Sequence, residues 1–342
     1  MAQNSNVHDR YDLDVTGVNT VRDVSDVIYN ISPTEFPMQS NAQRGTADQT
    51  YKEWLVDALA DPSASNKHID GDQFSNDTLD SAEVLGNYCQ ISWKILEVTR
   101  RANKTKKYGR KQEMAYQIAK KGKELKRDIE YIIMGGGGHQ VAAAGSSSVA
   151  PTSASIGSWL KTNVSRGTDG ASPTLSSTTY GYPNATPTDG TDRALSQATL
   201  LGIITDCYIQ GGSPGTIMVG PQTKQNISSF LFSSSARIAT PYQPASQTQS
   251  KGVRAIGSVD IYVSDFGVLD IVPNRFQREN DVFVLDMEFW EIAYFDPFHV
   301  DDVPNAGDAE RKAIIADWTL VSRNEKASGI VADVDSTTAM VA

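Results

Sequence analysis

The chain has little of what disulfide-linked, membrane-spanning or secreted proteins require. Only two cysteines, Cys89 and Cys207, occur in 342 residues, too few for a disulfide framework, so buried and reduced thiols are expected. No run of about 18 apolar residues is present, and the sequence therefore predicts no transmembrane helix. Residues 1–26 contain no apolar stretch behind a basic cluster, so no signal peptide is predicted. We expect a protein that matures in a cytoplasm.

Residues that carry catalysis are also scarce. The four histidines share no metal-ligand spacing with one another or with a cysteine. Residues 296–302 (Asp-Pro-Phe-His-Val-Asp-Asp) form the one cluster of carboxylates with a histidine. A divalent metal site using Asp296, His299, Asp301 and Asp302 is one interpretation of this cluster, and an acidic surface turn is the favoured one.

Glycine-containing motifs indicate turns rather than ligand sites. Gly135–Gly138 follow a predicted helix, whereas phosphate-binding loops precede one, so they are interpreted as a hinge or helix breaker. Asp70-Gly71-Asp72 lacks the later ligands of a calcium loop and is interpreted as a tight turn. The Gly-x-Ser-x-Gly match at 211–215 lies between a predicted helix and a predicted strand, the reverse of what a nucleophile elbow needs. The sequence predicts no catalytic, cofactor-binding or metal-binding residue and no cofactor.

Charge is distributed unevenly along the chain. The net charge is −10 and the pI about 4.9, yet the stretch from Arg100 to Arg127 holds 12 Lys or Arg and only two acids. Upstream, residues 52–83 hold two lysines and eight acids, which are Glu53, Asp57, Asp61, Asp70, Asp72, Asp77, Asp80 and Glu83. A chain divided in this way is expected to dock onto something charged, and copies of itself are the obvious partner.

The basic stretch is open to three interpretations. It is a solvated helix face, a contact for acidic segments of a partner, or a contact for nucleic-acid phosphates. The negative charge of the remaining chain opposes phosphate binding. None of the five tryptophans alternates with its arginines as a base-stacking platform requires.

The first 99 residues are predicted to be extended. Residues 1–45 form an arm, since the prolines at 33 and 37 forbid a long helix. Ile31, Phe36 and Met38 are its expected anchors, and a short helix is predicted at 23–29. Residues 46–99 form a hairpin with strands at 50–57 and 84–95 and a tip that has almost nothing to bury. The second strand alternates with period two at Cys89, Ile91, Trp93 and Ile95. Because such a hairpin is not stable alone, it needs a neighbour.

Regular structure is predicted from residue 109 onward. A helix at 109–134 carries one stripe of apolar or small residues, Met114, Ile118, Gly122, Leu125, Ile129 and Ile132, and surface pairs Lys120–Glu124 and Lys126–Glu130. Residues 139–190 are interpreted as surface loops with an edge strand at 156–164. A helix at 192–210, a strand at 216–219, a helix at 221–231 and strands at 259–264, 267–272, 281–286, 289–295 and 312–322 follow. This order indicates an α+β fold.

Several stretches carry a resemblance when they are taken in order. They are 51–59 (Tyr-Lys-Glu-Trp-Leu-Val-Asp-Ala-Leu), 69–72 (Ile-Asp-Gly-Asp), 87–91 (Asn-Tyr-Cys-Gln-Ile), the helix 111–134, 160–163 (Leu-Lys-Thr-Asn), 194–230 and 259–318. Over residues 21–334 the chain resembles the major capsid proteins of tailed bacteriophages with the Hong Kong 97-like fold, and among these the SU10-like group. The resemblance rests on the order of these stretches and on their general residue pattern, and no single motif is diagnostic. Where that family has Glu-Gly at the hairpin, this chain has Asp70-Gly71.

The resemblance implies an N-terminal arm (1–45), an E-loop (46–99), a P-domain (100–190) with spine helix 109–134 and insertion 139–190, an A-domain (191–300), and a return to the P-domain with a tail (301–342). It implies a non-enzymatic protein whose copies form hexamers and pentamers of an icosahedral head around double-stranded DNA, contacted non-specifically at most. The implied location is the virion, after assembly in a bacterial cytoplasm and without membrane contact. Scaffolding, portal and decoration proteins are further expected partners.

Acid-to-base contact between copies is the resulting hypothesis for the functional surface. The E-loop of one copy is expected to lie across the helix region of its neighbour. The predicted contact residues are Glu53, Trp54, Asp57, Asp70, Asp72, Asp77, Asp80, Arg100, Arg101, Lys104, Lys106, Lys107, Lys120, Lys123 and Arg127. Two rival interpretations are another phage structural subunit, such as a tail tube or fibre, and a metal-dependent enzyme built on 296–302.

Overall fold

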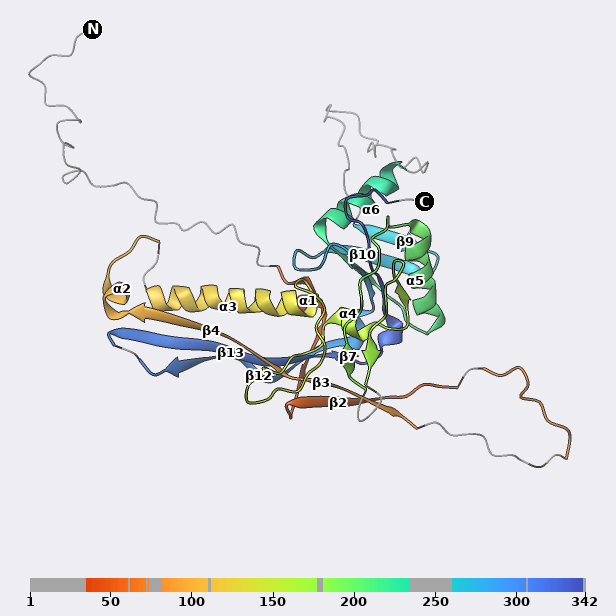
Figure 1. The fold of residues 1–342 in the computed structure, drawn as a ribbon, viewed down its shortest axis with the longest axis horizontal. Coiled ribbons are helices and arrows are strands. Elements are labelled where there is room, and N and C mark those ends of the chain that lie inside the picture. Colours follow the sequence, from red (N-terminus) through yellow and green to blue (C-terminus); the bar gives the residue numbers. More distant parts are fainter. Residues whose placement is uncertain are drawn as a thin grey trace, which may run out of the picture.

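The computed structural model describes residues 35–60, 62–71, 73, 81–109, 112–176, 181–233, 260–305 and 307–340. Figure 1 shows three parts: a long helix lying on a sheet at the left, a second sheet with helices at the upper right, and a hairpin that projects at the lower right. The predicted helix at 23–29 and the anchor Ile31 lie outside the described residues.

The left-hand part is a four-stranded sheet in the order β1-β12-β13-β4. Its strands are β1 (Gln43–Thr46), β12 (Trp290–Val303), β13 (Ala309–Ser322) and β4 (Gln90–Thr99). β13 pairs antiparallel with both of its neighbours, and β1 pairs parallel with β12.

Helix α3 (Glu113–Ile133) lies on one face of this sheet because an apolar stripe lines its inner side. Met114, Leu125 and Ile129 are buried, as predicted, in one cluster with Leu96 and Val98 of β4. The helix begins at Glu113 rather than at residue 109, since Gln112 still has extended backbone angles.

The upper-right part is a six-stranded sheet in the order β5-β14-β11-β8-β10-β9. Its strands are β5 (Val164–Ser165), β14 (Gly329–Val331), β11 (Val282–Leu285), β8 (Thr216–Val219), β10 (Gly267–Pro273) and β9 (Ile261–Ser264). One face, including Ile217 and Val284, packs with α5 (Gln197–Ile209) and Ile227 of α6 (Pro221–Ser233). The other face, including Met218 and Phe283, joins the core that α3 and β4 also enter.

Short elements complete the fold. The hairpin pairs β2 (Tyr51–Val56) with β3 (Glu83–Tyr88), and β6 (Thr174–Leu175) pairs with β7 (Pro183–Ala185). The remaining helices are α1 (Pro37–Asn41), α2 (Arg100–Lys104), α4 (Ile156–Trp159) and two 3-10 turns at Met287–Phe289 and Glu325–Ala327. Within the predicted arm, Met38 is fully buried and Phe36 stacks on Phe276.

The returning strand of the hairpin differs from the prediction. The structure divides 84–95 at Cys89: β3 stays in the hairpin, and β4 enters the four-stranded sheet. The alternation at Ile91, Trp93 and Ile95 is present, but these side chains point away from α3 and are exposed. The period-two pattern identified one face of a strand correctly without showing whether anything covers it.

Residues 139–190 are not only surface loops. Ser153 to Leu160 are buried, and Ile156–Trp159 form a helical turn instead of the predicted edge strand. The apolar residues Ile156, Trp159 and Leu160 are three and four positions apart, which is helical spacing. The edge strand is confined to Val164–Ser165.

The segment 296–302 is not a surface turn. It lies inside the long strand β12, where irregular register accommodates Pro297. Strand β12 therefore extends from Trp290 past residue 300, the predicted boundary between two domains, and pairs with β13 on both sides of this irregularity. Strand β14 instead joins the six-stranded sheet.

A buried carboxylate near the end of α3 connects three parts of the chain. Glu130 is fully buried and accepts hydrogen bonds from the backbone N–H groups of Met38 (2.8 Å) and Gln39 (3.1 Å) at the start of α1. It also accepts from the side-chain amides of Gln39 (3.1 Å) and Asn274 (2.8 Å). The predicted surface pair of Glu130 with Lys126 is therefore wrong. The helix N-terminus of α1 suits this negative charge.

Replacing Glu130 by Ala should destabilise the protein. The substitution removes the acceptor of four buried donor contacts, and each donor left unpaired costs roughly 1–3 kcal/mol. We expect the free energy of unfolding to fall by about 3 kcal/mol or more, measured by urea denaturation of the purified protein. Glu124→Ala, at a partly exposed position of the same helix, is the control and should cost about 0.5 kcal/mol at most. Equal effects of the two substitutions would contradict the assigned role.

Glu130 should also make stability depend on pH. Burial raises the pKa of this carboxyl above its ordinary value of 4.5, against the lowering effect of its hydrogen bonds. Because the folded state holds the proton more tightly, this contribution is complete below pH 4.5 and is lost as pH rises through the raised pKa. The unfolding free energy of the wild type relative to Glu130→Gln should therefore fall as pH rises. Denaturation of both proteins between about pH 4 and 8 tests this, and a constant difference would refute it.

Candidate interaction surfaces

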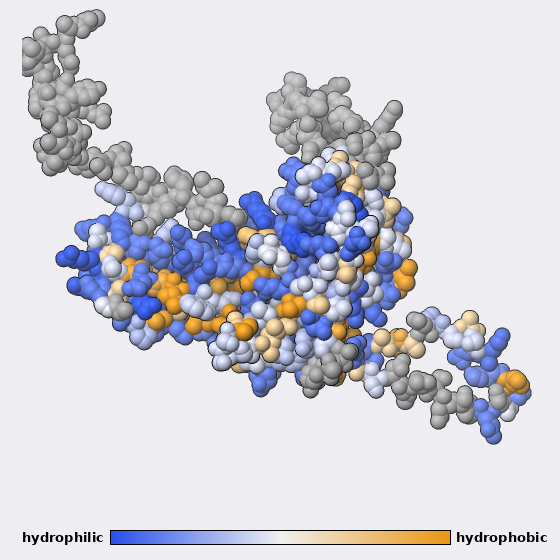
Figure 2. Space-filling model, viewed as in Figure 1, coloured by the Kyte–Doolittle hydropathy of each residue, from blue (hydrophilic) through white to orange (hydrophobic). Residues whose placement is uncertain are grey.

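The predicted basic residues lie on α2, in the segment that follows it, and along α3. Helix α2 begins where the Thr99 side chain accepts a hydrogen bond from the Ala102 N–H. Figure 2 shows a predominantly hydrophilic surface along the upper side of α3. Five cations are exposed and form no ion pair within the described part of the chain, namely Arg101, Lys104, Lys106, Lys120 and Lys123. We call these five residues the basic surface.

The other predicted cations already have partners. Arg100 pairs with Asp308 (2.7 Å), and Lys107 pairs with the buried Glu113 (2.7 Å). Arg127 lies over the ring of Phe276 at 5.7 Å. The predicted pair Lys120–Glu124 is wrong, because Glu124 pairs with Lys121 (2.7 Å). These contacts fix the end of the sheet and leave Lys120 available.

The acidic residues of the hairpin point into solvent. Glu53, Asp57 and Asp70 are exposed, whereas Asp72, Asp77 and Asp80 lie outside the described residues. Leu59 is 99% and Ile69 81% exposed, so the hairpin extension buries almost nothing in its own chain. Figure 1 shows it projecting away from α3, so Glu53, Asp57 and Asp70 do not meet the basic surface of their own chain.

Trp54 does not belong to the exposed contact set. Its ring lies 5.4 Å from the ring of the buried Trp159 and packs against the main core. Trp54 alternates with the exposed Glu53 and Leu55 along β2, so it anchors the base of the hairpin. The sequence could not show that the face of β2 with Trp54 packs inward while the face with Glu53 and Leu55 points outward.

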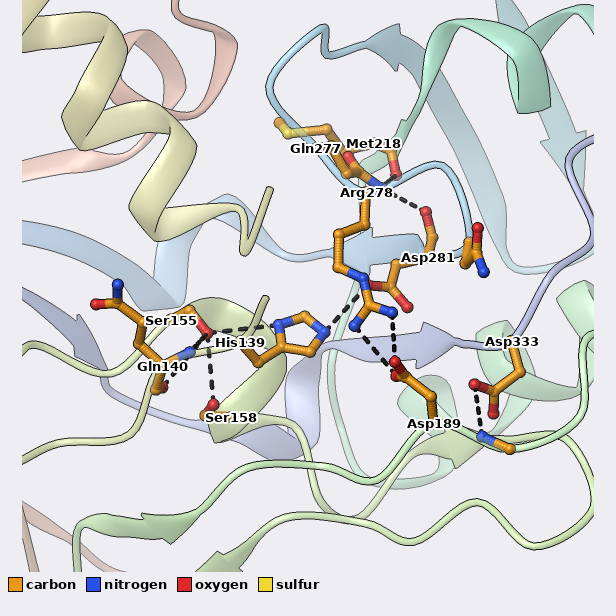
Figure 3. Close-up of polar contacts among 12 residues, drawn as sticks. His139, Gln140, Ser155, Ser158, Asp189, Met218, Gln277, Arg278, Asp281 and Asp333 are labelled. Carbon is orange, nitrogen blue, oxygen red and sulfur yellow. Dashed lines mark hydrogen bonds and ion pairs between the residues drawn. The ribbon is translucent and has the colours of Figure 1, made fainter. Parts of the chain in front are cut away.

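A buried polar network that the sequence did not reveal lies between the two sheets (Figure 3). The ring of His139 is 3.0 Å from Asp281 and 3.4 Å from the Ser155 hydroxyl, and Arg278 binds Asp189 through two hydrogen bonds. Ser155 is fully buried, so this Ser-His-Asp arrangement offers no access to a substrate. A Cβ on Gly157 would lie 2.2 Å from the His139 ring, so that glycine makes the space. In the sequence, the glycines near His139 were the one feature that could have indicated this network.

The cluster at 296–302 shows no metal-binding geometry. His299 lies 3.3 Å from Asp296 and 3.4 Å from Asp301 on the face of β12. The hydrogen bond to the Pro297 carbonyl and these carboxylates raise the pKa of His299. No group of three or more His, Cys, Asp or Glu side chains in the described ranges is arranged to hold a metal ion.

The two cysteines are free and buried, as predicted. Burial raises the pKa of both thiols to about 12, so neither is a nucleophile at neutral pH. Among the described residues, no helix is both long and apolar enough to cross a bilayer.

Comparison with known proteins identifies the family. A family model described as SU10 major capsid protein matches residues 6–335. The major capsid protein of Escherichia phage Phieco32 is 37% identical over 106 residues, a match that spans 31% of this chain and 30% of that protein.

Solved structures show the same fold. A chain of the cyanophage A-1(L) capsid asymmetric unit aligns with a TM-score of 0.61 at 14% identity, over 92% of this chain and 97% of that one. A chain of the capsid of a native GTA particle aligns with a TM-score of 0.58 at 10% identity, over 94% and 98%. The mixed helix and strand structure is thus the Hong Kong 97-like fold of phage capsids, as predicted. The chain belongs to the SU10 major capsid protein family.

Proposed function

We propose that the protein is the structural subunit of a phage head, without enzymatic activity of its own. Copies assemble as hexamers and pentamers of an icosahedral shell around double-stranded DNA, in the cytoplasm of a host bacterium. In this proposal α3 and the four-stranded sheet form the P-domain, the six-stranded sheet forms the A-domain, and the β2–β3 hairpin is the E-loop. Scaffolding, portal and decoration proteins are its further partners. Family membership and the shared capsid fold support this function.

The exposed hairpin is the observation that favours self-assembly. Two paired strands alone do not form a stable unit in water. The exposed Leu55, Leu59 and Ile69 need a surface to cover them, and the chain itself supplies none in its described part. A neighbouring copy supplies that surface when subunits repeat around a closed ring.

Charge complementarity selects the basic surface as the place where the hairpin docks. Glu53, Asp57 and Asp70 are exposed on the hairpin, and Lys120 and Lys123 are exposed on α3. One exposed ion pair contributes less than about 1 kcal/mol. Many such pairs, repeated around a shell, add up to a large effect. DNA is contacted non-specifically at most, because the overall charge of −10 opposes phosphate binding.

Purified protein should form closed shells or ring-shaped capsomers. Negative-stain electron microscopy of the expressed chain, with and without a co-expressed scaffolding protein, tests this directly. Tubes or fibres would favour a tail subunit, and a solitary monomer at high concentration would overturn the proposal.

Charge reversal on the hairpin should impair assembly. Asp57→Lys combined with Asp70→Lys places like charges against the basic surface, so we expect the particle yield to fall at least fivefold while the subunit remains folded. Asp206→Lys with Asp265→Lys is a matched control, because both acids are exposed on the six-stranded sheet region. Particle yield is measured by sedimentation and electron microscopy.

A reciprocal exchange separates charge pairing from general damage. Lys120→Glu with Lys123→Glu should also lower the yield, and combining it with the hairpin reversal should restore part of it. If both double variants give an undiminished particle yield, the proposed acid-to-base contact is wrong. The proposal that the protein forms shells would still stand.

A further inference from the structure

The face of the four-stranded sheet that points away from α3 carries a second surface. Lys94 of β4 pairs with Asp128 of α3 (2.5 Å), and Leu96 is buried, so alternate residues of β4 face the helix. The residues between them, Ile91, Trp93 and Ile95, are 53%, 56% and 37% exposed on the opposite face. At about 3.3 Å per residue they form an apolar row of roughly 13 Å along an edge strand. Such an exposed edge is normally covered in an assembled protein.

A parallel row of charged residues crosses the same face. The register places His299 opposite Ile315 and Ile315 opposite Trp93, and it places Asp301, Ala313 and Ile95 in the next line. Asp296 and Asp317 face each other in the line of Ile91. Two strand spacings separate the two rows, about 10 Å, which is close to the diameter of one helix. The apolar row and the acidic row therefore fit within a single contact.

The charge of this face is negative. Asp296 and Asp301 are more than half exposed, and His299 lies 3.3 Å and 3.4 Å from them and offsets part of their charge. On the same face Arg311 lies 3.5 Å from Glu97 and offsets it. Burial and the nearby Asp296 raise the pKa of Asp317, as expected for carboxylates gathered on one side. We call Ile91, Trp93, Ile95, Asp296 and Asp301 the acidic–apolar face.

The hairpin of a neighbouring copy does not match this face. Its exposed charges are the acids Glu53, Asp57, Asp70 and Glu83 and one lysine, Lys67. Acids that would meet Asp296 and Asp301 with the same sign are therefore in excess. Like charges brought together at an interface oppose binding. The partner that fits has aliphatic side chains for the apolar row and Lys or Arg for the acidic row, with a cation placed over Trp93.

We propose that the acidic–apolar face binds a basic amphipathic segment of a second protein. A helix with leucines on one side and lysines on the other would set its leucines on Ile91, Trp93 and Ile95 and direct its lysines to Asp296 and Asp301. This site lies on the opposite side of the sheet from α3 and the basic surface, so it serves a partner other than the hairpin.

Peptide binding tests the proposal. The probe is a 14-residue helical peptide of leucine and lysine, with a leucine and glutamate peptide of the same pattern as its counterpart. Binding to the unassembled full-length subunit is followed by the anisotropy of a fluorophore on the peptide. We expect the lysine peptide to bind at least tenfold more tightly than the glutamate peptide, and equal affinities would overturn the proposal.

Substitutions locate the site. Trp93→Ser, and separately Asp296→Asn with Asp301→Asn, should each weaken binding of the lysine peptide at least fivefold. Val263→Ser with Val268→Ser is the matched control, because these residues form another exposed apolar pair, on β9 and β10, and it should leave binding unchanged. Unchanged binding to both site variants would place the peptide elsewhere and refute the assignment.

Assembled particles distinguish a foreign partner from a neighbouring copy. If the face serves a second protein, particles made from this chain alone should bind the lysine peptide as the free subunit does. Particles that have lost binding would show that another copy covers Trp93, which would overturn the proposal without affecting shell formation. If electron microscopy shows no particles, that result counts against the proposed function and not against the proposed binding face.

Discussion

The buried carboxylate of Glu130 is the contact on which the arrangement of the chain depends. It lies near the end of α3, receives two backbone N–H groups at the start of α1, and holds Asn274 in the loop that follows β10. A polar group buried away from solvent is expensive, and here it is tolerated because four donor contacts satisfy its oxygens. The same contact sets the direction in which α1 leads into β1, which then pairs with β12. One side chain thus fixes the N-terminal segment, the long helix and the six-stranded sheet to one another.

The His139 network has a related role at the other side of this junction. His139 follows the glycines that end α3, whereas Asp281 precedes β11 and Asp189 follows β7. Both junctions use hydrogen bonds between polar groups that are far apart in sequence, so each specifies a single geometry more sharply than apolar contact would. The division of surface charge is built on this frame. Cations gather on the α3 side of the slab and carboxylates on the far side of its sheet, which gives the two sides different partners.

The parts that could be predicted from the sequence are those set by local pattern. The stripe at Met114, Leu125 and Ile129 identified α3, and the strand predicted at 216–219 is β8. The start of α5 was predicted less well. The predicted helix begins at residue 192, whereas Ser196 caps the observed helix four residues later through a capping box.

The remaining features depend on tertiary contact. Glu130 and Lys126 are spaced as a surface pair, and only the position of α1 shows that Glu130 is buried instead. Trp54 and Trp93 are both tryptophans on strands, yet one packs on Trp159 and the other faces solvent. For the candidate contact surface, sequence indicated which charges exist, but not that Arg100 and Lys107 are already paired. The division of the chain into a P-domain and an A-domain also depends on tertiary contacts, and it stays a prediction.

The passage from β3 to β4 has a mechanical consequence. Cys89 is the single residue between them, and its N–H is still bonded to Thr50 of the hairpin. The Asn87 amide, two residues earlier, donates to Leu320 of β13 and accepts from Ala154. No loop therefore separates the hairpin from the sheet. A force on the outer end of the hairpin is transmitted directly to β4 and its neighbour β13, so the hairpin and the sheet move together about Asn87.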